Sequence, residues 1–342
     1  MKKILFIEAP EEMLYGKAMK RSFRDLGYEL QEPEYLGLPD GTTDKKLLEA
    51  QNKKYIAAAE SFKPDVAFVV NNLNVEPMFL EYCQQYNIGL YMSCYDSIRW
   101  CGNAMECMQY YDDIFSYEPL DTKIEFKPGH FIKYMPLGYD RVLLKPLANR
   151  SYKYDLCFVG DLDPRRIELL DKVANWAAEH NKKLVVYTSR QLKKITSLRL
   201  APKIFFRGLR FRMQHGNLYK AIINEPIFGE PLCELYNSTR ICLNINVGKD
   251  PGMHTGTNPR TFEILGCQAF ELLDEGHIAN VDLKGGRDLV EFTDAQDLLQ
   301  KIEYYLQRDE ERQRIAKQGC KKVEEKYSCQ VLVKQMTEMM DR

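Results

Sequence analysis

The chain has 342 residues, a formal net charge of −1 and a hydrophobic content of 45%, values that are ordinary for a soluble globular protein. This length predicts two domains, because single hydrophobic cores rarely grow beyond about 250–300 residues. The balanced charge excludes a chain-wide field that would attract nucleic acid or another polyanion. No apolar run approaches the roughly 20 residues that cross a bilayer.

Residues 4–7 are the first apolar run and predict a buried strand. Glu8, Glu11 and Glu12 follow it too early for the apolar core of a secretory leader. The ten cysteines lack paired short spacings, which is typical of reduced, buried thiols and not of disulfides or zinc sites. We therefore expect a cytoplasmic protein without a bound metal.

Apolar runs alternate with helical patterns along the first part of the chain. The expected strands are 4–7, 65–70, 89–92, 114–116 and 132–135, and the expected helices are 16–26, closed by Gly27, and 76–86. This alternation predicts a parallel sheet with helices on both faces.

The alternation restarts after the turn-forming residues 146–152. The expected strands are 154–159, 183–187, 204–206, 241–245, 270–273 and 289–292, and the expected helices are 164–179, 230–237 and 295–327, the last broken near Gly319. The fold class is therefore α/β, with two Rossmann-like, doubly wound domains facing across a cleft. We expect the domains to be 1–148 and 149–326, with a C-terminal helix, 327–342, packing back toward the first. Ligands of such sheets bind at the carboxyl ends of the strands.

The segment 258–274 carries the strongest functional signal, and its letters indicate a loop, a short helix and a strand. Asn258 and the proline after it suit the cap and first turn of a helix, and Gly266 suits its end. A helix N-terminus that follows a glycine-containing loop binds anions readily. Arg260 and Glu263 place a cation and a carboxylate on one helix face, as a nucleotide diphosphate and a ribose would need.

The letters R-T-F-E-I-L-G-C-x-A-F-x-L-L of this segment resemble the C-terminal domain of glycosyltransferases related to the spore-maturation protein CgeB. The resemblance covers residues 134–342 and continues in 158–160, 241–245 and 302–306. Those enzymes belong to the two-domain GT-B class. The resemblance implies that the C-terminal half binds a nucleotide-diphosphate sugar and the N-terminal half an acceptor.

The resemblance also assigns donor contacts in the loops of the C-terminal half. Gly160 lets a backbone approach a ligand closely, and Arg165 suits bidentate phosphate recognition; a solvated arginine is the alternative. Residues 204–209, which include Arg207 and Gly208, look like the strand and turn that contact the nucleotide base in GT-B enzymes. A core strand without a binding role is the alternative.

A glycine-rich loop, residues 248–258, precedes the expected short helix and can cradle phosphates. The donor-binding candidates in the loop and helix are Lys249, His254, Thr255, Asn258, Arg260, Thr261 and Glu263. In the large family of retaining GT-B enzymes, two glutamates separated by seven residues mark this site. Glu263 matches the second, which holds the ribose, but the first falls on Thr255. The resemblance therefore leaves open whether the mechanism of those enzymes, including retention of configuration, applies here. A capping or salt-bridged structural role is the alternative for Glu263.

GT-B enzymes typically stabilise the leaving diphosphate with basic residues and helix dipoles. Arg165, Lys249 and Arg260 could do so here, which predicts transfer without a metal. Residues 209–229 interleave basic and aromatic side chains. A solvated surface loop is the first interpretation, and anionic lipid headgroups or a lipid-linked acceptor are the alternative.

The N-terminal half should hold the acceptor and any catalytic base. Asp96 follows an expected strand and is the first candidate for a base that accepts the hydroxyl proton; an Asx-turn or helix cap is its alternative. The acidic residues after the first strand are second candidates. Asn71, Asn72 and Asn74 could bind sugar hydroxyls, and His130 is a further option.

The predicted function is transfer of a sugar from a nucleotide-diphosphate sugar to an unidentified glycan, lipid-linked or protein acceptor. The donor is a substrate, and no cofactor and no nucleic-acid partner are expected, while peripheral membrane contact is left open. One alternative is a non-catalytic binding or structural protein on the same fold, which the threonine at position 255 favours. Another is a nucleotide-sugar epimerase.

Overall fold

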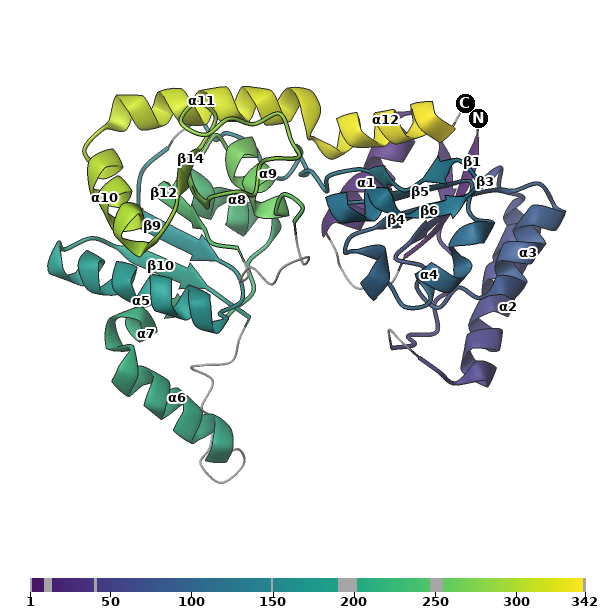
Figure 1. Ribbon diagram of the computed structural model, residues 1–342, viewed down its shortest axis with the longest axis horizontal. Coiled ribbons are helices and arrows are strands. Elements are labelled where there is room, and N and C mark those ends of the chain that lie inside the picture. Colours follow the sequence, from purple (N-terminus) through teal and green to yellow (C-terminus); the bar gives the residue numbers. More distant parts are fainter. Residues whose placement is uncertain are drawn as a thin grey trace. The chain divides into compact units, whose positions relative to one another are not determined.

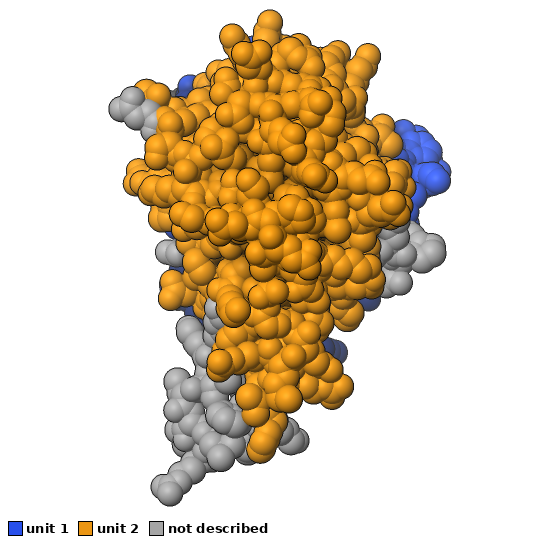
Figure 2. All heavy atoms as spheres, turned by 90° about the vertical axis from the view of Figure 1, so that its left-hand side faces the viewer, with its two compact units in different colours: residues 1–140, 252–257, 326–342 blue, residues 141–251, 258–325 orange. Residues whose placement is uncertain are grey.

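The structure is a computed structural model that describes residues 2–8, 14–39, 42–148, 150–189, 202–246 and 255–340. For Leu14, residues 202–205 and Arg207 it describes the backbone alone. The chain divides into two compact units, which Figure 2 distinguishes by colour. The first unit comprises residues 1–140, 252–257 and 326–342, and the second comprises residues 141–251 and 258–325.

The described part of the first unit contains a six-stranded parallel sheet with the order β2-β1-β3-β4-β5-β8. Its strands are β1 (Lys3–Ile7), β2 (Glu29–Gln31), β3 (Val66–Val70), β4 (Gly89–Cys94), β5 (Asp113–Ser116) and β8 (Lys133–Tyr134), and β6 (Glu125–Lys127) and β7 (His130–Phe131) form a separate antiparallel pair. Its helices are α1 (Leu14–Asp25), α2 (Lys45–Phe62), α3 (Pro77–Gln85), α4 (Ala104–Cys107) and α12 (Cys329–Met340), with short 3₁₀ turns η1 (Ile98–Trp100), η2 (Met108–Tyr110) and η3 (Pro119–Lys123).

Burial explains why these strands lie inside the unit. All five residues of β3 are buried, and a strand buried on both sides needs helices on both faces of its sheet. Helix α12 comes from the far end of the chain and packs against α1 (Figure 1).

The second unit repeats this plan, with a six-stranded parallel sheet of order β11-β10-β9-β12-β13-β14 in its described part. Its strands are β9 (Tyr154–Val159), β10 (Leu184–Tyr187), β11 (Ile222–Ile223), β12 (Thr239–Asn244), β13 (Glu271–Asp274) and β14 (Val290–Phe292). Its helices are α5 (Pro164–Glu179), α6 (Pro202–Gln214), α7 (Gly216–Ala221), α8 (Gly229–Asn237), α9 (Pro259–Gly266), α10 (Ala295–Leu306) and α11 (Asp309–Lys326). The two parallel sheets confirm the predicted α/β class.

The prediction of a strand at 204–206 is wrong, because these residues lie in helix α6. The run of three apolar residues suggested a strand, but Gly208 and Phe211, three residues apart, are both buried while Leu209 and Arg210 are exposed. That spacing belongs to a helix. The strand that pairs with β10 on the side away from β9 is β11, which has only two residues.

The predicted helix break near Gly319 is also wrong. The helices α10 and α11 are separated at residues 307–308, and α11 continues through Gly319. A Cβ at Gly319 would lie 2.2 Å from the carbonyl oxygen of Asp288. The glycine is therefore needed for close packing and not for a break. All ten cysteines are free and buried, as their spacing predicted.

Candidate functional site

Helix α9 begins and ends at the predicted residues. The Oδ1 atom of Asn258 accepts a hydrogen bond from the backbone N–H of Arg260 at 2.9 Å, so Asn258 is the N-cap, and Pro259 occupies the first turn. The helix ends at Gly266, followed by Cys267 as its C-cap. Exposed N–H groups at such a helix start, together with its dipole, favour an anion nearby.

Arg260 and Glu263 lie on one face of α9, as predicted from their spacing. The Nη1 atom of Arg260 donates a hydrogen bond to Oε2 of Glu263 at 2.7 Å, and the two side chains are 25% and 17% exposed. Burial lowers the pKa of Arg260, and the adjacent carboxylate of Glu263 raises it by a larger amount. The net shift of the pKa is therefore upward. The guanidinium therefore keeps its charge, and both groups retain exposed surface with which to bind a ligand.

A pocket of about 200 Å³ includes Arg260 among its walls. The lining residues are Val159, Gly160, Asp161, Tyr187, Thr188, Ser189, Glu225, Pro226, Ile227, Phe228 and Arg260. They come from the loops after β9, β10 and β11 and from α9, at the carboxyl ends of parallel strands. Doubly wound sheets bind their ligands at this edge, so the pocket is the candidate ligand site of the second unit.

The structure thus brings Gly160 and Arg260 together, as the sequence predicted. It adds Tyr187, Glu225 and Phe228, which the sequence pattern did not indicate. The position of Tyr187 at the end of β10 was a usable signal. No comparable signal marked the other two, because β11 is too short to recognise as a strand.

Arg165 has an intramolecular partner at the start of α5. Its guanidinium binds Asp274 at the end of β13 through two hydrogen bonds of 2.6 and 2.7 Å. The same group donates to the carbonyl of Asn246 at 3.1 Å. The hydrogen bonds to Asp274 raise the pKa of Arg165. Arg165 therefore ties α5 to β13, and its side chain is 35% exposed.

The loop between β9 and α5 contains an Asp-x-Asp spacing, from Asp161 to Asp163, which is the signature of metal-dependent, single-domain glycosyltransferases. The carboxylate of Asp163 caps α5 by accepting a hydrogen bond from the N–H of Arg166 at 2.9 Å. Asp161 accepts a hydrogen bond from the hydroxyl of Ser189. Both carboxylates thus have protein partners. The described residues contain no group of three or more His, Cys, Asp or Glu side chains placed to hold a metal ion.

A buried polar network supports α9 from below. Thr261 is fully buried and donates a hydrogen bond to Oε1 of Glu271 at 3.0 Å, while Nδ2 of Asn244 donates to the same oxygen at 2.7 Å. Asn258 extends the network to Asn246, from Nδ2 to Oδ1 at 3.2 Å. Thr261 was expected to contact the donor, but the structure places it inside the unit, where it holds the helix.

Burial raises the pKa of Glu271 from its ordinary value of 4.5 to about 7. A carboxyl with a raised folded-state pKa keeps its proton longer when folded, so stability falls as pH rises from about 4.5 to about 7. At about 1.4 kcal/mol per pH unit, this group should reduce the free energy of unfolding by roughly 3 kcal/mol over that window. Glu271→Gln keeps the Oε1 acceptor and cannot titrate, so it should remove this slope.

Urea denaturation at about pH 5 and about pH 8 would measure the effect. Glu303→Gln, a change at an exposed residue of α10, is the matched control and should keep the wild-type slope. Equal slopes in the wild type and in Glu271→Gln would show that Glu271 is ionised in the folded protein at both pH values.

The described end of the glycine-rich loop is held by a carboxylate that the sequence pattern did not reveal. Thr255 donates through its backbone N–H to Oε2 of Glu118 at 2.9 Å and through its hydroxyl to Oε1. Glu118 is 1% exposed and follows β5. A Cβ at Gly256 would lie 2.4 Å from the carbonyl oxygen of Tyr117, so glycine is required there. The sequence did contain a signal for a functional or capping role of Glu118, because this residue lies just beyond a strand and before a proline.

Several predicted donor contacts cannot be placed at the pocket. Lys249 and His254 lie outside the described residues, as do Glu11 and Glu12 in the first unit. Arg207 lies in α6, where only its backbone is described, and Gly208 is buried in the same helix. Because α6 is a helix and not a strand, these two residues do not form the predicted base-contacting turn.

Asp96 lies in the first unit, two residues beyond the end of β4, and its side chain is exposed. The cap of the short helix η1 is Ser97, whose hydroxyl accepts from the N–H of Arg99 at 3.4 Å. The alternative role of Asp96 as a cap is therefore taken by its neighbour. The carboxyl end of β4 holds Asp96 at the edge where ligands bind in parallel sheets.

Glu8 follows β1 at the same edge of this sheet. Its carboxylate accepts a hydrogen bond from the hydroxyl of Tyr95 at 3.2 Å and lies 3.5 Å from the ammonium of Lys20. Burial raises the pKa of Glu8, and Lys20 offsets part of that shift. A carboxylate of this kind is suited to accept a proton.

The asparagines of the following loop have structural roles. Asn71, Asn72 and Asn74 adopt left-handed backbone conformations, with φ of 53°, 48° and 50°, which asparagine tolerates better than most residues. Asn72 and Asn74 are buried and bonded to protein groups, Asn74 donating to the hydroxyl of Tyr35 at 2.9 Å. The buried amides of Asn72 and Asn74 therefore shape the loop, whereas the side chain of Asn71 is half-buried and accepts a hydrogen bond from the N–H of Tyr95 at 2.7 Å. His130 is exposed in β7.

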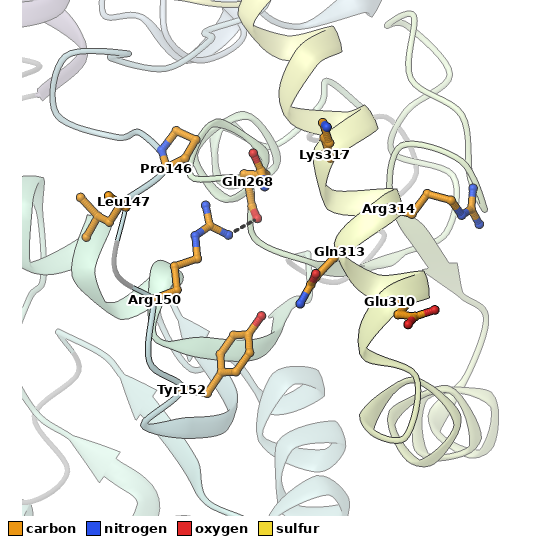
Figure 3. Close-up of a pocket in the computed structure, with 10 residues that line it drawn as sticks. Pro146, Leu147, Arg150, Tyr152, Gln268, Glu310, Gln313, Arg314 and Lys317 are labelled. Atoms are coloured by element: carbon orange, nitrogen blue, oxygen red, sulfur yellow. Dashed lines mark hydrogen bonds between the residues drawn. The ribbon is translucent and has the colours of Figure 1, made fainter.

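A larger pocket, of about 750 Å³, lies at the opposite edge of the second sheet, between residues that precede β9 and β13 and residues of α11 that include Arg314 (Figure 3). Arg150 donates there to the carbonyls of Gln268 and Cys267 at 2.8 and 2.7 Å, which satisfies the end of α9. Since ligands of doubly wound sheets bind at the carboxyl ends of strands, the smaller pocket remains the candidate site.

Within the described ranges, every helix is too short or too polar to cross a membrane. A family model described as glycosyl transferase-like matches residues 141–338, more than half of the chain. Among curated proteins, none matches the chain in sequence.

Solved structures resemble the chain over its full length. Sucrose-phosphate synthase from Thermosynechococcus elongatus has a TM-score of 0.69 at 12% identity, over 100% of this chain and 98% of that chain. HepE from Anabaena, solved with UDP and glucose, has a TM-score of 0.65 at 12% identity, over 100% of both chains. A glycosyltransferase from Rickettsia africae has a TM-score of 0.67 at 10% identity, over 99% of this chain and 97% of that chain. At these identities the likeness shows the fold, and it confirms the predicted GT-B architecture.

Proposed function

The chain belongs to the glycosyl transferase-like family, and we propose that it transfers a sugar from a nucleotide-diphosphate sugar to an acceptor, without a metal. We place it in the CgeB-like branch of that family and in the cytoplasm. The observation that carries the proposal is the pair of Arg260 and Glu263 at the start of α9, where Arg260 lines a pocket at the carboxyl ends of parallel strands.

The donor is assigned to the second unit. Arg260 and the N–H groups at the start of α9 would neutralise the diphosphate, and Glu263 would accept hydrogen bonds from the ribose hydroxyls. Phe228 is 53% exposed in the pocket wall, and its ring could stack on the nucleotide base. The complexes of HepE with UDP and UDP-glucose support a nucleotide sugar as the first ligand to test.

The acceptor is assigned to the first unit, at the carboxyl ends of β1 and β4. Asp96 is the proposed base for an inverting transfer, and Glu8 is the second candidate. The acceptor class is a glycan, a lipid-linked sugar or a protein, each of which offers a hydroxyl or amide to the donor.

Glu263→Ala is expected to weaken nucleotide binding tenfold to a hundredfold. The lost charge-assisted hydrogen bonds should cost roughly 1.5–3 kcal/mol. Calorimetric titration with UDP and UDP-glucose would measure it. The matched control is Glu168→Ala, which removes an exposed glutamate of α5 that pairs with Lys172 and should leave affinity unchanged. A folded Glu263→Ala protein with wild-type affinity would remove Glu263 from the donor site.

The second candidate function is a non-catalytic binding protein on the same fold. Thr255 stands where retaining enzymes carry their first glutamate, and this observation favours it. Incubation of the pure protein with nucleotide sugars separates the two functions. Release of the nucleoside diphosphate, with or without acceptor, supports an enzyme, whereas binding without turnover against an acceptor panel supports the binding protein. Conversion of the sugar itself without acceptor would reveal an epimerase.

A further inference from the structure

Helix α6 has two apolar sides that lie opposite each other. Residues three or four apart share one helix face. Phe211 is 8% exposed and joins the core of the second unit, and His215, one turn beyond it, packs on its ring and faces Asp171 of α5 at 3.2 Å. This inner face explains how α6 is attached to the unit.

The outer face of α6 is formed by Phe206, Leu209 and Met213, which are three and four residues apart. These side chains are 59%, 40% and 79% exposed. Figure 1 shows α6 extending away from the sheet of the second unit, beyond α7. Three large apolar side chains on one exposed face are unusual for a surface helix, because such positions are normally polar.

The charges of α6 are all positive. Its sequence, PKIFFRGLRFRMQ, contains four basic residues and no acidic residue. At 100° per residue, Arg210 and Arg212 fall on either side of the outer face, and both are exposed. No residue in the described ranges forms an ion pair with either, and Arg212 lies 5.8 Å from the ring of Tyr219.

An apolar face flanked by arginines is the pattern of helices that lie in the interface of a bilayer. Apolar side chains enter the acyl boundary, and the cations contact anionic headgroups. Nucleic acid or an acidic protein would satisfy the arginines but not the Phe–Leu–Met face. An apolar protein groove would satisfy that face but leave the arginines without partners.

We propose that α6 docks this protein onto bilayers containing anionic lipids, through Phe206, Leu209 and Met213 with Arg210 and Arg212 beside them. The formal net charge of the chain is −1, so the attraction is local to this helix. The inference goes beyond the proposed transferase activity and does not depend on it. Where both hold, the docked enzyme would meet lipid-linked acceptors at the bilayer surface.

Flotation of the full chain with lipid vesicles tests the proposal. We expect binding to vesicles of phosphatidylcholine with phosphatidylglycerol, little binding to pure phosphatidylcholine, and weaker binding at high salt. The triple variant Phe206→Ser, Leu209→Ser, Met213→Ser should lose at least about tenfold in vesicle affinity, and Arg210→Glu with Arg212→Glu should lose a similar factor.

Leu47→Ser is the matched control, because Leu47 is 44% exposed on α2 in the first unit, and it should bind as the wild type does. Thermal unfolding checks that each variant is folded, which is expected because the changed side chains are exposed. Absence of binding to anionic vesicles, or unchanged binding by the triple variant, would overturn the proposal. The proposal would also be overturned if the wild type formed a dimer, the triple variant were a monomer and neither bound vesicles. The face would then be a protein interface.

Discussion

Replacing Arg260 by alanine is expected to lower kcat for sugar transfer by about 10²–10³-fold. As the bond to the sugar breaks, negative charge accumulates on the leaving diphosphate, and a cation held in place stabilises it most at that moment. Arg260 lines the pocket, is fixed by its 2.7 Å hydrogen bond to Glu263, and lies in the first turn of α9, whose dipole adds to its effect. Initial rates at saturating donor would measure the loss.

The control for this variant is Arg314→Ala, which removes an arginine from the larger pocket at the other edge of the sheet and should keep kcat. Arg260→Lys keeps the charge but not the planar fork, so it should recover part of the rate. Chelation by EDTA should leave wild-type transfer intact. If chelation abolishes transfer and magnesium or manganese restores it, a metal stabilises the leaving group, and the residues around Asp161 and Asp163 become its candidate ligands.

Local signals were sufficient to predict most of the regular structure. Strand β9 and helix α5 occupy the predicted residues because an apolar run and a proline-started helix are both defined by neighbours in the chain. Helix α9 was predictable for the same reason, since its cap and first turn lie within three residues. The position of α9 at the ligand-binding edge followed from the topology of doubly wound sheets.

Two elements differ from the sequence prediction because tertiary packing outweighs the local sequence pattern there. Gly319 suggested a helix break, but the helix continues because a glycine there lets α11 approach the backbone of Asp288. The apolar letters around Phe206 suggested a strand, but Phe211 and Gly208 pack as one face of a helix. Both errors have the same cause. The residue type indicates one local structure, but the residue makes a contact with a part of the chain that is distant in sequence.

The limit of sequence reasoning is clearest in polar contacts between residues that are far apart in the chain. Arg165 binds Asp274, which is 109 residues away, and Thr255 binds Glu118, which is 137 residues away. No spacing rule identifies such partners. The pair of Arg260 and Glu263 was predictable because three residues separate them on one helix.

Asp96 is the proposed base for an inverting transfer. If transfer inverts the anomeric configuration, a side chain must accept the proton of the acceptor hydroxyl, and its removal should lower the rate by about 10²–10⁴-fold. Asp96→Asn removes the basic carboxylate and keeps the size of the side chain. Its donor affinity should equal that of the wild type, because the donor is assigned to the other unit. Rates and calorimetric titration together would measure both quantities.

Glu8→Gln is the informative comparison for this variant, because Glu8 is a carboxylate at the same sheet edge whose pKa is raised by burial. A large loss in Asp96→Asn with a small loss in Glu8→Gln places the base after β4, whereas the reverse places it after β1. The anomeric configuration of the product decides whether either is needed. A retained configuration would make a base for the acceptor hydroxyl unnecessary. The assignment of Asp96 as a catalytic base would then be wrong.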